Sequence, residues 1–408
     1  MTVKPKKILI IGAGIGGLTT ALACLQRGFE VQVLEQAPAL EEVGAGIQIP
    51  PNASKILAAL GLEQEIAARA FRPQELETRM GQSGQQVFSI ALNAKTLNHW
   101  GAAYYHIHRA DYVAVLSAAL QARAKDALVL NATFSHYQQT ADAVVAHMTD
   151  GRQFLGDILI GADGLRSRVR QQILGPEQPR FTGNMAWRAV VPLTALNHPP
   201  PPNACVWMGP GRHAVTYHLA AGLVNFIGVV EGQDFVQEDW HTTGARHQAA
   251  ADFADWHPII TGLIDKAEAL HCWALYDRQT LSTWCDGRVV LLGDAAHPML
   301  PFMAQGAAMA VEDGWALADC LAAQASHSPH AQQDIADALR AFQNRRLPRT
   351  MAAQNASRRN MKTFHRSTVV SQLANYGPMW LGGKLAPHLV RRRLDWLYRY
   401  DETAVAIG

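Results

Sequence analysis

The stretch Ile8-Leu-Ile-Ile-Gly-Ala-Gly-Ile-Gly-Gly17 decides the fold of this chain of 408 residues. Four consecutive apolar residues are typical of a parallel strand buried on both faces, and the glycines that follow indicate a tight turn. Residues 18–27 have helical character, Gly28 ends that helix, and residues 31–34 form a second strand. The stretch therefore predicts a β-α-β unit at the start of a doubly wound α/β sheet.

Three glycines and one acid in this unit match a dinucleotide-binding fingerprint. At Gly12, Gly14 and Gly17 the missing side chains would let a pyrophosphate reach backbone N–H groups at the positive end of the helix. Glu35 ends the second strand, where its carboxylate could accept hydrogen bonds from ribose hydroxyls and would repel a 2′-phosphate. The pattern favours FAD or NAD over NADP, and a glycine-rich structural turn is the alternative.

The overall composition argues against several classes of protein. Lys plus Arg number 36 and Asp plus Glu number 34, so the net charge of +2 provides no field that would attract nucleic acid or a membrane. No apolar run approaches the roughly 20 residues of a membrane helix, and the apolar run after the basic N-terminus is too short for a signal peptide. The odd number of scattered cysteines favours a reducing cytoplasm and suggests neither disulfides nor a metal site; they are Cys24, Cys205, Cys272, Cys285 and Cys320.

Two later segments, 157–164 and 288–294, indicate further strand-to-loop joints of the α/β sheet, because each is an apolar strand that ends in Gly and Asp. Between these two joints the sequence pattern is different, and strand-like segments at 186–191 and 223–230 predict an inserted β-rich domain. The C-terminal end is expected to be helical and basic. Further helices are expected over 52–60, over 110–123 and from Gln305 to about residue 346.

Features near the second joint help to distinguish a flavin site from a nicotinamide site. Asp294 follows its strand, where a carboxylate suits the hydroxyls of a chain such as the ribityl of FAD. A helix that opens at Gly306 and Ala307 would aim its N-terminus at an electron-accepting ring. As patterns alone, these joints could simply be strand-to-loop corners. The glycine pairs at 44–46 and 209–211 are not followed by a convincing helix, so no second nucleotide site is predicted.

Residues 12–17, 161–168 and 293–298, continued by 304–307 and 312–313, closely resemble the three signatures of group A flavoprotein aromatic hydroxylases. Within that family the chain looks most like the branch that contains salicylate hydroxylase, 3-hydroxybenzoate 6-hydroxylase and 6-hydroxynicotinate 3-monooxygenase. The Trp-x-Trp-x-Ile-Pro motif of related halogenases is not found, which argues against halogenation.

The resemblance implies a fold with three parts. The expected class is α/β, with a Rossmann-like FAD-binding domain, an inserted β-rich substrate domain and C-terminal helices. The FAD-binding domain is expected to comprise 1–80, 101–178 and 276–345, the substrate domain 81–100 and 179–275, and the C-terminal helical segment 346–408.

The resemblance also implies roles for the cofactor residues. The three fingerprint glycines and Glu35 would hold the ADP part of a non-covalent FAD. Arg109 would contact its phosphate or ribityl region, and Asp294 would bind the ribityl chain. Asp163 belongs to a motif that serves both FAD and the nicotinamide, which in this family visits transiently and needs no Rossmann fold of its own.

The implied reaction is hydroxylation of a small phenolic or hydroxylated heteroaromatic carboxylate with NADH or NADPH and O2. In this family it passes through a flavin C4a-hydroperoxide, which an electron-rich ring attacks. A cytoplasmic monomer or homodimer is expected, with no nucleic-acid or membrane partner.

Candidate catalytic residues come from the β-rich insert and from the loop after Asp294. A phenol has a pKa near 10, so a base beside the substrate would supply the more nucleophilic phenolate. His213 and Tyr217 share one face of an expected strand, and the matching segment in relatives contacts the substrate. Pro301 and Gln305 would shape the pocket next to the flavin, with Gln305 as a hydrogen-bond donor.

Two other polar residues are expected to have structural roles. His297 is expected to be a buried structural histidine, and Arg188 is expected to form an interdomain salt bridge rather than to receive a substrate carboxylate. Three other functions are alternatives: a flavoprotein that oxidises or epoxidises a larger lipophilic ring, a non-catalytic flavoprotein sensor, and a nicotinamide dehydrogenase.

Overall fold

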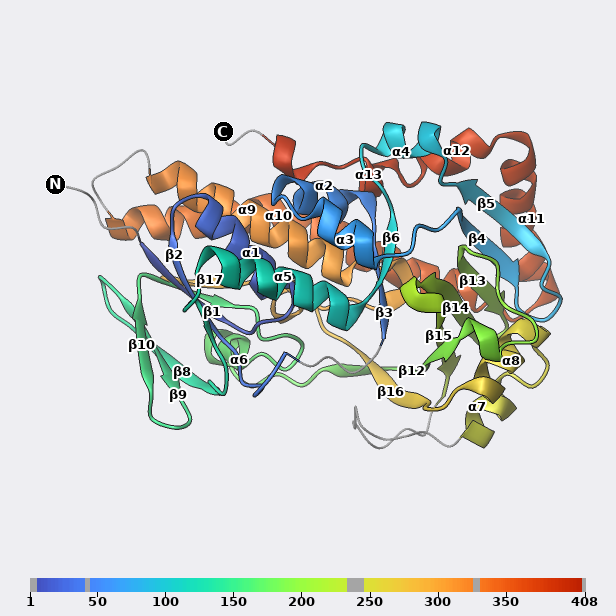
Figure 1. Ribbon diagram of the computed structural model, residues 1–408, viewed down its shortest axis with the longest axis horizontal. Coiled ribbons are helices and arrows are strands. Elements are labelled where there is room, and N and C mark those ends of the chain that lie inside the picture. Colours follow the sequence, from blue (N-terminus) through green and yellow to red (C-terminus); the bar gives the residue numbers. More distant parts are fainter. Residues whose placement is uncertain (1–5, 41–44, 233–245, 326–330, 406–408) are drawn as a thin grey trace.

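The computed structural model describes residues 6–40, 45–232, 246–325 and 331–405. A six-stranded sheet lies towards one end of the molecule and a seven-stranded sheet towards the other, and long helices connect them (Figure 1). The six-stranded sheet has the order β17-β18-β11-β1-β2-β7, and its neighbours are parallel except for β17 and β18. Its strands are β1 (Lys7–Ile11), β2 (Glu30–Leu34), β7 (Leu128–Val129), β11 (Ile158–Gly161), β17 (Cys285–Asp286) and β18 (Val289–Leu291).

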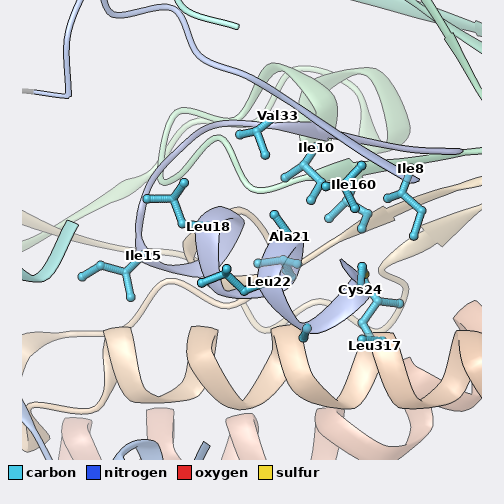
Figure 2. Close-up of a cluster of buried hydrophobic side chains, with 14 of the residues drawn as sticks. Ile8, Ile10, Ile15, Leu18, Ala21, Leu22, Cys24, Val33, Ile160 and Leu317 are labelled. Carbon is cyan, nitrogen blue, oxygen red and sulfur yellow. The ribbon is translucent and has the colours of Figure 1, made fainter. Parts of the chain in front are cut away.

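The predicted β-α-β unit is confirmed and forms the centre of this half of the molecule. Helix α1 (Ile15–Gln26) lies between the central strands and helix α9 (Gly306–Ala325), as Figure 2 shows. Ile8, Ile10 and Ile160 are fully buried on the strands, and Leu317 of α9 is fully buried on the other side of α1. Burial of each such side chain contributes about 1.5–3 kcal/mol, so this layer holds the glycine turn between β1 and α1 in place.

The seven-stranded sheet has the order β16-β12-β15-β14-β13-β4-β5. The strands expected at 186–191 and 223–230 are confirmed as parts of β12 and β15. One join in this sheet is parallel: β13 lies beside β4, a strand that comes from much earlier in the chain. The strands are β4 (Glu75–Met80), β5 (Gln86–Ala91), β12 (Arg180–Pro192), β13 (Ala204–Gly209), β14 (Arg212–Leu219), β15 (Leu223–Glu231) and β16 (His271–Asp277).

The remaining elements form two small sheets and a set of helices. The small sheets contain β3 (Gly46–Ile49) with β6 (Tyr105–His108), and β8 (Phe134–Gln139), β9 (Val144–Met148) and β10 (Gln153–Gly156). Among the described residues, none of the helices combines the length and apolar character needed to cross a bilayer. The other α-helices are α2 (Pro51–Ala59), α3 (Glu63–Arg69), α4 (Ala94–Trp100), α5 (Arg109–Arg123), α6 (Arg168–Leu174), α7 (Arg246–Asp252), α8 (Pro258–Lys266), α10 (Ala331–Phe364), α11 (Val369–Leu385), α12 (Pro387–Arg392) and α13 (Asp395–Tyr398).

The helices expected at 52–60 and 110–123 are confirmed as α2 and α5. The helical region expected from Gln305 to about residue 346 is formed by α9 and α10, and α10 continues through Pro348 to Phe364. A proline inside a helix removes one backbone hydrogen bond, but Arg346, two residues earlier, is fully buried and forms ion pairs with Glu312 and Asp313 of α9. These contacts hold α10 against α9 across the proline.

The division of the chain into domains stays a prediction. The segment 1–80, expected to belong to the FAD-binding part, includes β4, which pairs in the seven-stranded sheet.

Candidate cofactor and substrate site

The turn between β1 and α1 has no room for a side chain at Gly12 or Gly17, but it is open at Gly14. Gly12 has a φ of +102°, and a Cβ atom there would lie 2.6 Å from the carbonyl oxygen of Ala162. A Cβ atom on Gly17 would lie 2.1 Å from the carbonyl oxygen of Gly12, whereas one on Gly14 would meet nothing within 4 Å. No described side chain caps the first turn of α1, which also has no acidic residue. Its N–H groups therefore border open space, as a pyrophosphate site requires.

Glu35 lies just after β2 and is oriented by two backbone donors. Its Oε2 accepts a hydrogen bond from the backbone N–H of Ala13 at 2.7 Å, and its Oε1 accepts one from Ala37 at 2.9 Å. A carboxylate offers about four lone-pair positions, so the fixed group can still accept hydrogen bonds from hydroxyl groups. This arrangement fits the ribose of a dinucleotide.

Asp294 lies in the short turn that follows β18, beside the first residue of α9. Asp294 is exposed to solvent, although many protein atoms surround its carboxylate. Its Oδ1 is 4.0 Å from a Cβ atom built on Gly306. The pKa of Asp294 is raised by desolvation, against the lowering effect of the positive charges of His297 and Arg109. Arg109 is the first residue of α5. An exposed acid in this surrounding can accept hydrogen bonds from a polyhydroxy chain.

Asp163 has a structural role that the sequence pattern did not indicate. Its Oδ2 accepts hydrogen bonds from the backbone N–H groups of Arg168 at 2.8 Å and Val169 at 3.2 Å, at the start of α6. Its Oδ1 is buried and has no partner among the described residues, and desolvation raises the pKa of the carboxyl group. The free oxygen leaves room for a cofactor contact.

Gln305 lies just before α9 and is almost completely buried, with 1% exposed. Its Oε1 accepts a hydrogen bond from Nδ2 of Asn52 at 3.1 Å, while its Nε2 has no partner among the described residues. An unpaired buried donor costs about 1–3 kcal/mol, so a ligand that accepts from Nε2 would relieve it. Pro301, by contrast, is exposed in a short turn before Gln305, and Phe302 beside it is buried.

His297 is part of a buried ionic cluster. Its Nε2 is 2.5 Å from Oδ2 of Asp313, whose Oδ1 accepts a hydrogen bond from Arg346 at 2.8 Å. Burial would raise the pKa of Asp313, but the charges of His297 and Arg346 lower it to about 2. These contacts favour the structural role expected for His297.

His213 and Tyr217 lie on the same face of β14, and each is 2% exposed. Four strand positions span about 13 Å, and the two side chains contact different neighbours. The Tyr217 ring lies 4.7 Å from that of His106, and Nδ1 of His213 lies 2.7 Å from Nε2 of His365. Burial lowers the pKa of His213 and raises that of Tyr217.

Arg188 lies on β12, and its guanidinium stacks over Trp273 at 4.7 Å. The salt bridge expected for Arg188 is wrong as far as the described residues extend, because no acid there pairs with it. Desolvation lowers the pKa of Arg188, Tyr217 raises it, and Arg109 lowers it further. Arg188 is therefore a half-buried cation whose pKa responds to both Tyr217 and Arg109.

Two buried polar residues next to Tyr217 were missed by the sequence analysis. Nδ1 of His106 lies 3.1 Å from the carbonyl oxygen of His218, its Nε2 has no partner among the described residues, and burial lowers its pKa to about 3. Asn225 accepts a hydrogen bond from the backbone N–H of Gly46 at 2.7 Å, and within the described residues its Nδ2 is unpaired. The environment of Tyr217 thus offers one acceptor and one donor to a ligand.

The glycine pair at 44–46 has a packing role at one of its two positions. A Cβ atom on Gly46 would lie 2.6 Å from the Tyr217 ring, so only glycine allows this approach. Gly44 lies outside the described residues. Gly209 and Gly211 flank the turn between β13 and β14.

Comparison with known proteins finds matches that extend over most of the chain. The model of the family described as FAD binding domain matches residues 6–357. The 3-amino-4-hydroxybenzoate 2-monooxygenase of Streptomyces platensis is 37% identical over 361 residues, 88% of each chain. The 6-hydroxynicotinate 3-monooxygenase of Bordetella bronchiseptica is 37% identical over 361 residues, 88% of this chain and 91% of that one. The crystal structure of Klebsiella pneumoniae HpxO with FAD and uric acid is similar with a TM-score of 0.82 and 27% identity, covering 95% of both chains.

Proposed function

We propose, on the premise that this chain belongs to the FAD binding domain family, that it hydroxylates a small aromatic ring bearing both a hydroxyl group and a carboxylate. The chain is a flavoprotein monooxygenase, as are its relatives that are more than 30% identical over most of its length. The choice of substrate class rests on the residues that surround Tyr217. We place the reaction in the cytoplasm, with a monomer or homodimer as the active form.

FAD is the cofactor, and the residues described above fit it. When bound, FAD takes two electrons from NADH or NADPH and activates O2, so that one oxygen atom can be transferred to the substrate. The open turn at Gly14 and the oriented carboxylate of Glu35 would bind the ADP part. Asp294 and Arg109 would bind the ribityl and phosphate region, Asp163 would contribute its unpaired oxygen, and the start of α9 at Gly306 and Ala307 would face the ring.

Arg188 is the observation that carries the carboxylate part of the proposal. A guanidinium that is partly desolvated and has no paired acid is energetically unfavourable. A carboxylate bound to it through two hydrogen bonds would compensate its charge. Because Arg188 is near enough to Tyr217 to influence its pKa, a ligand carboxylate on Arg188 would place the ring beside the Tyr217 hydroxyl. A small hydroxylated aromatic acid has these two groups.

The polar residues His213 and Tyr217 on β14 would then take part in the transfer of the proton from the substrate hydroxyl. Burial keeps His213 neutral, so its imidazole can accept a proton, and Tyr217 can hydrogen-bond to the substrate oxygen. Such a base contributes typically 10²–10⁴ in rate. The unpaired Nε2 of Gln305 would orient the ring, and Pro301 with Phe302 would close the pocket.

The test is a screen with the FAD-loaded protein. NADH and NADPH oxidation would be measured with hydroxybenzoates, aminohydroxybenzoates and hydroxynicotinates, each beside its analogue that lacks the carboxylate. We expect stimulation by one hydroxylated acid and a product that contains one oxygen atom from labelled O2. Stimulation only by large lipophilic rings would instead favour the alternative substrate class, and FAD binding without any stimulation would favour a sensor.

A further inference from the structure

A chain of three polar side chains runs from His213 on β14 to the surface. Nδ1 of His213 lies 2.7 Å from Nε2 of His365, and Nδ1 of His365 lies 2.8 Å from Oε1 of Glu231. The two histidine side chains are buried, whereas the Glu231 side chain is 57% exposed. Each separation is that of a hydrogen bond, so the path is continuous.

The inner part of this path is lined by apolar rings. The centroid of the His213 ring lies 5.1 Å from that of Phe302 and 5.3 Å from that of Phe364. The desolvation that these surroundings impose disfavours a charged His213, and His365 reinforces that effect. A proton that reaches His213 therefore cannot remain there and must be passed on.

The outer part of the path reaches solvent. Glu231 ends β15 and lines an open surface hollow of about 370 Å³ together with Thr182, Asn184 and Met361. Burial lowers the pKa of His365, and the hydrogen bond and charge of Glu231 oppose this effect only in part. Within the described residues, no other acid hydrogen-bonds to either histidine. Neighbouring charged or titratable side chains are Arg212 of β14, Arg366 after α10 and Tyr376 of α11.

The carboxylate determines which nitrogen of each ring carries a hydrogen. An ionised carboxylate only accepts, so Nδ1 of His365 must donate to Glu231 and Nε2 of His365 must accept. Nδ1 of His213 must then donate, which leaves a lone pair on Nε2 of His213. This assignment follows from the hydrogen-bond pattern. A surface glutamate thus sets the basic atom of a buried histidine.

We propose that Glu231 and His365 orient His213 with a basic Nε2 and carry the substrate's hydroxyl proton to solvent. This inference rests on the proposed function. The O–H bond of the substrate breaks, its electron pair stays on the oxygen, and the proton binds Nε2 of His213. The hydrogen on Nδ1 of His213 moves to Nε2 of His365, and the one on Nδ1 of His365 moves to Glu231, which releases it to water. Each ring gains one proton and loses one.

The test uses Glu231→Gln in the FAD-loaded protein, with Asp255→Asn as the matched control. Glu231 is exposed, so its substitution should leave folding intact. Asp255 is also exposed, at 47% of its side chain, and pairs with Arg212 outside the relay. The amide of glutamine can donate to His365 and reverse the hydrogen-bond direction.

The first readout needs no substrate. Nitrogen-15 histidine NMR, with the His213 signals assigned by loss in His213→Asn, should show a hydrogen on Nδ1 of His213 in the wild type and in Asp255→Asn. In Glu231→Gln we expect it on Nε2. An unchanged tautomer in Glu231→Gln would overturn the proposed role of Glu231.

The second readout is proton release when the hydroxylated acid found in the screen binds to the oxidised protein, followed with a pH indicator. We expect Glu231→Gln to slow release about tenfold or more, with partial recovery at high pH, and Asp255→Asn to leave it unchanged. Release at the wild-type rate in Glu231→Gln would refute the relay. If no hydroxylated acid binds to the wild type, the proposed function fails, while the NMR result still decides the hydrogen-bond order.

Discussion

Replacement of Arg188 by methionine tests the substrate class most directly. Methionine is long and apolar, so it can keep much of the packing against Trp273 while it removes the charge. Arg188 is already partly desolvated before a ligand binds, so little further desolvation opposes its contact with a carboxylate. One charge-assisted hydrogen bond is worth about 1.5–3 kcal/mol. The dissociation constant of an acid should therefore rise about 10- to 150-fold.

The assay compares each acid with its own carboxamide. Titration of the oxidised flavoprotein, followed by the flavin absorbance, gives both dissociation constants without turnover. For Arg188→Met we expect the loss for the acid only, because the neutral amide does not need the guanidinium. Arg180→Met is a suitable control, since Arg180 lies on the same strand with 82% of its side chain exposed. Arg188→Lys should recover part of the affinity, because it restores the charge without the planar fork.

Two outcomes would refute this reasoning. An equal loss for the acid and the amide would mean that Arg188 supports the packing of β12 rather than a carboxylate. No loss for either would mean that the carboxylate binds elsewhere.

Three further predictions concern the cofactor, the proton and the fold. Glu35→Ala and Asp294→Ala should each weaken FAD binding about tenfold or more, measured by titration of the apoprotein; an unchanged affinity would contradict the assignment. Tyr217→Phe should still bind FAD but form less hydroxylated product and more H2O2 per NADH, with partial recovery at high pH; full coupling at neutral pH would exclude Tyr217 from proton transfer. The pKa of about 3 for buried His106 lies below its unfolded value, so stability from the neutral ring is present above pH ~6.5 and is lost as the pH falls. Between pH 6.5 and pH 5 the loss in the free energy of unfolding amounts to about 2 kcal/mol. Urea unfolding of His106→Gln should not show this pH-dependent loss; equal pH slopes in the wild type and the variant would argue against a buried neutral His106.

The sequence predicted features that depend on residues close to one another in the chain. The turn at Gly17 is one, because the atom that excludes a side chain there is the carbonyl oxygen of Gly12, five residues earlier. The position of Asp294 was anticipated from the end of an apolar strand and from the family resemblance. These signals lie within a few residues of the features that they predict.

Features that depend on distant segments were not predicted. His365 lies 152 residues from His213, and only the packing of the end of α10 against β14 brings the two rings together. Asn225 and Gly46 meet across 179 residues. No periodicity indicates such contacts. The salt bridge expected for Arg188 failed for a related reason, since the charges around a buried group depend on tertiary packing.

The parallel join between β13 and β4 limits how this enzyme can be re-engineered. Ala204–Met208 pair in register with Leu76–Met80, so the sheet that carries His213, Tyr217 and Arg188 is built from two separate parts of the gene. A chimera that exchanges only residues 180–277 with a relative would set a foreign β13 against the native β4. Transplanting substrate preference should therefore require a second insert, residues 75–91, taken from the same donor.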